Sequence, residues 1–105
     1  MTGIDWNKRT ELLDAIAEAA LTDAKAVEMV GIARIGIELD ARHTEAASKC
    51  SEVVRDYYLE QVNNMADRIH GERFTELTAL GIAWYDLRDA IDEAYLNEAR
   101  GISYE

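Results

Sequence analysis

The sequence predicts an all-α protein, an antiparallel bundle of three or four helices with a long C-terminal helix. The 105 residues contain no proline and only six glycines, so little in the chain interrupts a helix. Hydrophobic residues make up 49% of the chain, which is enough to build a folded core. Apolar residues also recur three and four positions apart over most of the sequence. We therefore expect a single helical-bundle domain over residues 1–105.

The longest apolar seam lies near the C-terminus and predicts one helix over Glu72–Arg100. A helix of this length extends roughly 40 Å, whereas a compact chain of this size is about 26 Å across. We expect this helix to span the molecule, with one end projecting or pairing with a second copy. Gly101 is expected to end it and to leave 102–105 as a short tail. The residues of the seam are Leu77, Leu80, Trp84, Leu87, Ile91 and Ala94.

The first helix is expected to begin at Asp5, because its carboxylate can accept hydrogen bonds from the free N–H groups of a first helical turn. Trp6 is interpreted as a lid over one end of the core. The residues that share the inner face of this helix are Leu12, Leu13, Ile16 and Ala20.

A second helix is expected over Ala24–Asp40, with Thr22 and Asp23 as candidate caps. Ile35, Ile37 and Leu39 alternate with smaller or polar residues, which is also the pattern of a strand. A lone short strand is unstable without a partner, and no other segment resembles one. Helix is therefore favoured, while a kink or a short strand remains an alternative.

The third helix is expected to be capped by Asp40 or Thr44 and to stop at Gly71, where a left-handed backbone suits glycine. Its apolar stripe includes Cys50, the only cysteine of the chain. A buried thiol without a nearby cation is unreactive, so we expect neither a disulfide nor nucleophilic chemistry there. The full stripe is Ala47, Cys50, Val54, Tyr57, Met65 and Ile69.

The net charge is −10, from 11 basic and 21 acidic residues, and such a surface repels nucleic acid and anionic membranes. Residues 72–105 hold eight of the acidic residues and three of the basic ones. The beginning of the chain has no apolar stretch typical of a signal peptide, and no apolar run is long enough to span a bilayer. We expect a cytoplasmic protein that contacts neither nucleic acid nor membrane directly.

Two Asp-x-x-His pairs, Asp40 with His43 and Asp67 with His70, have a spacing that could clasp a metal on one face of a helix. Together with helix carboxylates, they support an alternative function as a metal- or nucleotide-handling all-α enzyme. We nevertheless expect no catalysis, metal or cofactor, because these carboxylates should lie on outward faces opposite the apolar seams. The acidic runs are Glu11, Asp14 and Glu18, followed by Asp86, Asp89, Asp92 and Glu93.

The favoured function is protein binding, as an adaptor or inhibitor, by a homo-oligomer. Ile82, Tyr85, Tyr95 and Leu96 lie off the seam and are expected to form the apolar part of a partner surface. Asp86, Asp89, Asp92 and Glu93 are expected to form its electrostatic part, so that reversing their charges should leave stability intact. Carboxylates one helical turn apart are about 5–6 Å from each other, close to the pitch of DNA phosphates.

The partner could accordingly be a basic nucleic-acid-binding protein that recognises the chain as a DNA mimic. In size and charge, the chain is similar to phage anti-restriction and anti-CRISPR inhibitors, although no family motif is present. Binding of this kind should weaken as salt screens the charges.

Overall fold

The structure is a computed structural model that describes residues 3–101. These residues form five α-helices and no strand, so the all-α prediction is confirmed, including the helical interpretation of the second segment. The expected tail at 102–105 lies outside the described residues. The helices are α1 (Trp6–Thr22), α2 (Ala26–Ala41), α3 (Glu45–Glu72), α4 (Phe74–Ala79) and α5 (Trp84–Ala99).

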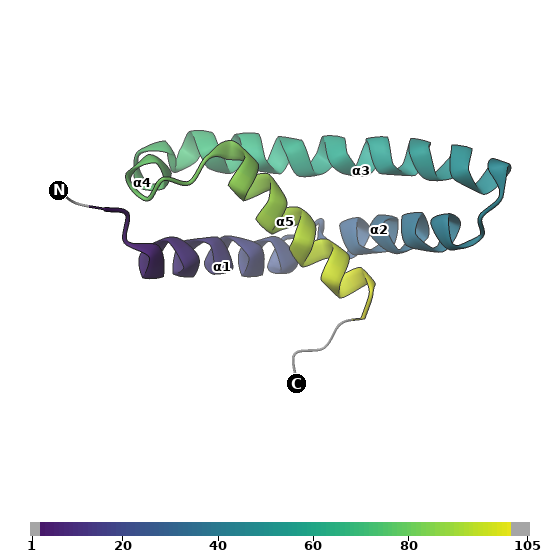
Figure 1. Cartoon of the computed structure of the whole chain (residues 1–105), viewed down its shortest axis with the longest axis horizontal. Helices are drawn as coiled ribbons and strands as arrows, with labels where there is room; N and C mark the ends of the chain where they lie inside the picture. The colour runs from purple at the N-terminus through teal and green to yellow at the C-terminus, as the bar shows by residue number, and fades with distance from the viewer. Residues whose placement is uncertain (1–2, 102–105) are drawn as a thin grey trace.

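The helices form an elongated arrangement with α3 along one side (Figure 1). Helices α1 and α2 follow each other along the opposite side, and α5 crosses them diagonally, while α4 closes one end. The described residues measure 54 × 31 × 27 Å and have a radius of gyration of 15.5 Å, against about 13 Å for a compact chain of this length. The excess length comes from α2 and α3, which continue past α5 as a two-helix arm (Figure 1).

Side-chain caps begin two of the helices at the positions that the sequence predicts. Asp5 accepts a hydrogen bond from the backbone N–H of Lys8, and Thr44 accepts one from that of Ala47. Asp23 instead accepts from the N–H of Lys25, which shapes the short connection between α1 and α2. Local sequence therefore determined where α1 and α3 begin.

The long helix predicted over Glu72–Arg100 is not confirmed, because the chain breaks between α4 and α5. Gly81 has a φ of +67°, a left-handed conformation that suits glycine and ends α4. The N–H of Ile82 then donates to the carbonyl oxygen of Leu77 at 2.9 Å. The longest helix is α3, with 28 residues, and it continues through Gly71 instead of stopping there. The expected count of three or four helices is likewise not confirmed.

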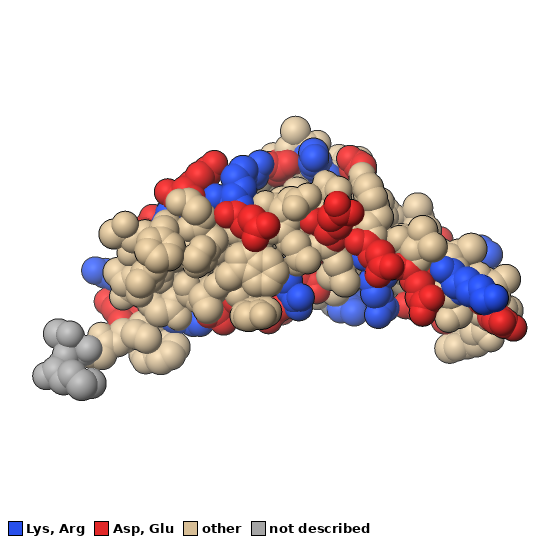
Figure 2. All heavy atoms as spheres, turned by 90° about the horizontal axis from the view of Figure 1, so that it is seen from above, with Lys and Arg blue, Asp and Glu red and all other residues tan. Residues whose placement is uncertain are grey.

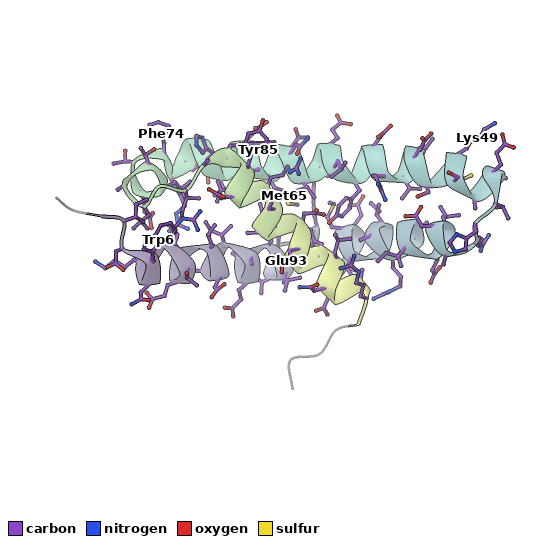
Figure 3. All side chains as sticks on the ribbon, viewed as in Figure 1. Trp6, Lys49, Met65, Phe74, Tyr85 and Glu93 are labelled. Atoms are coloured by element: carbon purple, nitrogen blue, oxygen red, sulfur yellow. The ribbon has the colours of Figure 1, made fainter. Side chains whose placement is uncertain are left out.

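The core lies where α5 packs across α1, α2 and α3. The hydroxyl of Tyr95 reaches the sulfur of Met65, which Figure 3 labels near the middle of the molecule. The largest fully buried side chains are Tyr95, Met29, Leu77, Leu87, Ile91 and Val62.

Three residues that the sequence pattern assigns to the core side are on the surface: Trp6, Cys50 and Tyr57, whose side chain is 44% exposed. The side chain of Trp6 is 63% exposed, because its ring lies over the guanidinium of Arg9 at the end of α1. Cys50 is also exposed, because the part of α3 that carries it lies in the arm, beyond the crossing with α5. Within residues 3–101, no helix has both the length and the apolar character needed to cross a membrane.

Candidate functional site

A groove of about 510 Å³ opens between α1 and α5, and its charge distinguishes it from the rest of the surface. Six of its lining residues are acidic and none is basic. The acidic residues come from both helices, so the sequence separates them by about 70 positions while the fold brings them to one place. They are Asp14, Glu18, Asp86, Asp89, Glu93 and Glu98.

The floor of the groove is apolar and built from small and medium side chains. Leu13, Ala17 and Leu21 follow one another four residues apart along α1, so they share one face. Ala90 and Ala94 contribute the same spacing from α5. The alanines leave room between the two helices, and the hollow is therefore a consequence of side-chain size at these positions.

The carboxylates around this floor differ in how far they are already engaged. Asp86 accepts a 2.9 Å hydrogen bond from the N–H of Ala83 and forms a 3.1 Å ion pair with Arg9. Asp89 pairs with Arg88 at 3.2 Å. In the part of the chain that the structure describes, no ion pair involves the other four, which are Asp14, Glu18, Glu93 and Glu98.

The acidic residues of α1 and α5 that line the groove are mostly exposed, as expected from the sequence, but their convergence in one groove was not predicted. Asp14 and Glu18 face the same groove as Asp89 and Glu93. The sequence does carry a signal for this arrangement, because acids spaced four apart flank Ala17 on α1. That signal shows which face is acidic but not which other helix the face meets.

Most residues of the predicted apolar partner surface are buried or half-buried. Ile82 and Tyr95 are 3% and 0% exposed, because both side chains point into the core beneath α5. Leu96 is half-buried beside a second hollow, between α2, α3 and α5. Tyr85 is 68% exposed, as predicted.

The predicted electrostatic residues also separate into two groups. Asp89 and Glu93 are exposed in the acidic groove. Asp92 lies on the other side of α5, where it accepts a 2.8 Å hydrogen bond from the hydroxyl of Tyr58. Burial of that hydroxyl, together with its bond to Asp92, raises the pKa of Tyr58. Asp92 is thus part of the packing between α3 and α5.

No protein family, curated protein or solved structure with which the chain was compared matches it. A functional proposal therefore rests on the geometry and charge of the chain itself.

Of the two Asp-x-x-His pairs on which the alternative metal site depends, only Asp67 and His70 lie on one helix, α3. His43 lies after the end of α2 with a φ of 54°, and Asp40 accepts from Ser51 and pairs with Arg55 instead. In the other pair, Asp67 accepts a 2.7 Å hydrogen bond from the indole N–H of Trp84, and the ring of His70 packs edge-on against Phe74. Among residues 3–101, no three His, Cys, Asp or Glu side chains are grouped so that they could hold a metal.

A second acidic feature, on α3, was not predicted. Glu52, Asp56 and Glu60 are exposed and lie four residues apart, so they form a stripe along the outer side of the helix. Figure 2 looks down on α3 and shows a diagonal row of acidic atoms along this face. Their nearest cations along the sequence are engaged elsewhere, since Lys49 pairs with Glu45 and Arg55 pairs across to α2.

Proposed function

We propose that this chain acts by binding a basic segment of another protein in the groove between α1 and α5. The observation that carries the proposal is the composition of the groove, in which six carboxylates and no cation surround an apolar floor. Lysine and arginine side chains gain electrostatic attraction at such a rim. Apolar side chains of the same segment gain by leaving water at the floor.

An amphipathic helix is the form of segment that satisfies both requirements. Its apolar residues recur at positions i, i+3, i+4 and i+7, and its flanks can carry lysine or arginine. Laid over Ala17 and Ala90, its apolar stripe would contact the floor, while its flanks would meet Glu18 on one rim and Glu93 on the other. Small residues favour this mode, because they let a helix approach closely.

Binding of this kind makes the chain an adaptor, or an inhibitor if the captured segment is needed for another activity. Nucleic-acid-binding proteins are a class of partner with suitable basic surfaces. DNA mimicry is the related alternative, in which charge alone is recognised. The α3 stripe of Glu52, Asp56 and Glu60 is the better candidate for it, because these carboxylates project at a regular spacing without an apolar floor between them.

The test compares two variants of equal net charge. The groove variant is Asp14→Asn, Glu18→Gln and Glu93→Gln, and the stripe variant is Glu52→Gln, Asp56→Asn and Glu60→Gln. The probe is a fluorescent amphipathic peptide of leucine, alanine and lysine, and its binding is followed by anisotropy. We expect the groove variant to bind at least about tenfold more weakly than the unmodified chain, equivalent to roughly 1.4 kcal/mol.

The stripe variant should retain nearly unchanged binding if the groove is the site. A scrambled peptide with the same lysines but no apolar stripe should bind more weakly than the amphipathic one. Equal losses in both variants would mean that the peptide senses only net charge, and would overturn the assignment to the groove. A selective loss in the stripe variant would favour the mimicry alternative instead.

A further inference from the structure

The side of the α2–α3 arm that faces away from α5 carries an apolar surface that no helix covers. On α3, exposed Ala46, Cys50, Val53 and Tyr57 follow at spacings of four, three and four, which is the spacing of a helix-packing seam. The side chain of Val53 is 70% exposed, far more than a packed seam residue would be.

Helix α2 carries a matching stripe, beginning at Glu28 and continuing through Ile32, Ile35 and Leu39 at the same spacing. The two helices run antiparallel, and a 3.2 Å hydrogen bond from the hydroxyl of Tyr57 to Glu28 places the two stripes side by side. Contacts with α5 lie on the opposite side, where Arg34 donates to the carbonyl oxygen of Ala99. Ile32 is half-buried and also lines the hollow between α2, α3 and α5, so it lies at the edge of this surface. We call the surface of Ile35, Leu39, Ala46, Cys50, Val53 and Tyr57 the arm face.

The charge of the arm distinguishes it from the rest of the chain. Residues 34–56 hold four of the eleven basic residues and five of the twenty-one acidic ones, a net charge of −1. The remaining residues therefore carry a net charge of −9. Two copies of a chain with charge −10 repel each other over most of their surface, and the arm is where that repulsion is smallest. Lys49 lies near the far end of the arm (Figure 3).

Side-chain size along the arm face is also self-complementary. The hydrogen bond between Tyr57 and Glu28 sets an antiparallel register that brings the bulky Ile35 and Leu39 of α2 level with the small Cys50 and Ala46 of α3. From this register we expect a ridge along α2 beside a shallow lane along α3. A two-fold axis places the ridge of each copy in the lane of the other, which is the requirement of a symmetric interface. Stacking two such hairpins produces a four-helix bundle, an architecture in which every helix buries an apolar stripe.

We propose that the arm face binds the arm face of a second copy of this chain, forming a symmetric dimer. The pairing covers Val53 and Ile35, and leaves the acidic groove between α1 and α5 free in each copy. This interface is independent of the partner binding proposed above. It also places self-association on α2 and α3, not on the C-terminal region.

The test is the mass of the full chain in solution, measured by sedimentation equilibrium and light scattering. We expect twice the chain mass of 11.8 kDa. Val53→Glu should yield a monomer, with a dissociation constant raised about a hundredfold or more, since it places a charge in an apolar interface. The matched control is Val27→Glu, which adds the same charge at an 87% exposed valine of α2 outside the arm face, and should remain a dimer.

Cys50 provides a second readout, because it is the only cysteine and it is exposed within the arm face. A short bis-maleimide should link two chains through this residue alone, and Val53→Glu should abolish the linkage. Circular dichroism checks that Val53→Glu remains helical, and Ile35→Lys serves as a second disrupting variant. A monomeric unmodified chain at high micromolar concentration would overturn the proposal. So would a dimer that tolerates both disrupting variants, or one that Val27→Glu also dissociates.

Discussion

The hydroxyl of Tyr95 donates a 2.9 Å hydrogen bond to the backbone carbonyl oxygen of Ala20, a residue 75 positions earlier in the chain. Ala20 lies in the last turn of α1, and its carbonyl oxygen also accepts a 3.3 Å hydrogen bond from the backbone N–H of Asp23 at the end of the helix. The same hydroxyl lies 3.4 Å from the sulfur of Met65. One buried side chain thus joins α5 to α1 and α3, and holds the two walls of the acidic groove together.

This contact predicts a loss of stability in alkaline solution. Burial raises the pKa of Tyr95 from 10.0 to about 12, so the folded state favours the protonated hydroxyl more than the unfolded state does. Stability should therefore be unaffected below pH 10 and should fall as the pH rises from 10 towards 12. Urea unfolding followed by circular dichroism across this pH range measures the slope of the unfolding free energy against pH. Tyr95→Phe should make this slope smaller without abolishing it, because the raised pKa of Tyr58 contributes a slope of the same sign. Tyr85→Phe, at an exposed position, should leave it unchanged. An unchanged slope in Tyr95→Phe would show that this hydroxyl is not responsible.

Two glycine substitutions should change stability in opposite directions. Gly81 has a φ of +67°, and a Cβ there would lie 2.5 Å from the Cδ1 of Ile4. We expect Gly81→Ala to reduce the free energy of unfolding by about 1–2 kcal/mol, mainly through backbone strain. Gly31 lies within α2, and a Cβ there would meet open space. Gly31→Ala should therefore raise the free energy of unfolding by about 0.5–1 kcal/mol. Denaturant midpoints test both, and a gain in Gly81→Ala would contradict the left-handed turn.

Neighbouring acidic residues on α5 should differ sharply in their effect on stability. Asp92 accepts from the hydroxyl of the buried Tyr58, so Asp92→Ala removes the charged acceptor and leaves only the backbone carbonyl oxygen of the same residue, 3.3 Å away. This change should cost about 1–2 kcal/mol. Glu93 is exposed in the groove, and Glu93→Ala should stay within about 0.5 kcal/mol. The sequence alone led us to expect that all four acidic residues of this stretch could be reversed without loss of stability. If Asp92→Ala lowered the thermal unfolding midpoint no more than Glu93→Ala, the expectation from the sequence would hold.

Salt should separate the two proposed interactions. Binding of a basic peptide in the groove depends on attraction between opposite charges, so its affinity should fall steadily as ionic strength rises. Association through the arm face depends on apolar contact between copies of like charge, so added salt should leave it unchanged or strengthen it. Anisotropy titrations and sedimentation at several salt concentrations measure the two. Peptide binding that is insensitive to salt would contradict the role of the rim carboxylates.

Comparison of α3 and α5 shows how far the sequence predicts this fold. Caps act within one turn, so neighbouring residues identified Asp5 and narrowed the start of α3 to Asp40 or Thr44, of which the structure shows Thr44. The break at Gly81 could not be predicted in this way, because the seam residues Leu77 and Leu87 are in the core on both sides of the turn and the seam appears continuous in the sequence. A glycine inside a helix costs only about 1 kcal/mol, so its presence does not by itself predict a break.

Predicting the candidate site required more knowledge of the tertiary structure than predicting the helix boundaries did. Periodicity identified Tyr95 and Ile82 as off the main seam, but both are core residues. Tyr95 lies one turn after the seam residue Ile91, so the buried face of α5 is wider than the predicted seam. Asp89 and Glu93 were predicted as exposed acids, and they are exposed. Their convergence with Glu18 required α5 to cross α1, which no local pattern encodes.

The sequence by itself determined the helical class, the starts of α1 and α3, and the strong acidity of the chain. These properties follow from interactions within a few residues or from simple addition of charges. Only the tertiary structure decided which acids share a groove, which aromatic residues are buried and which part of the bundle extends beyond the core. The physical reason is that helix packing depends on the direction in which the chain turns between helices. The turn at Gly81 sets the direction of α5, and therefore the helices against which its residues pack.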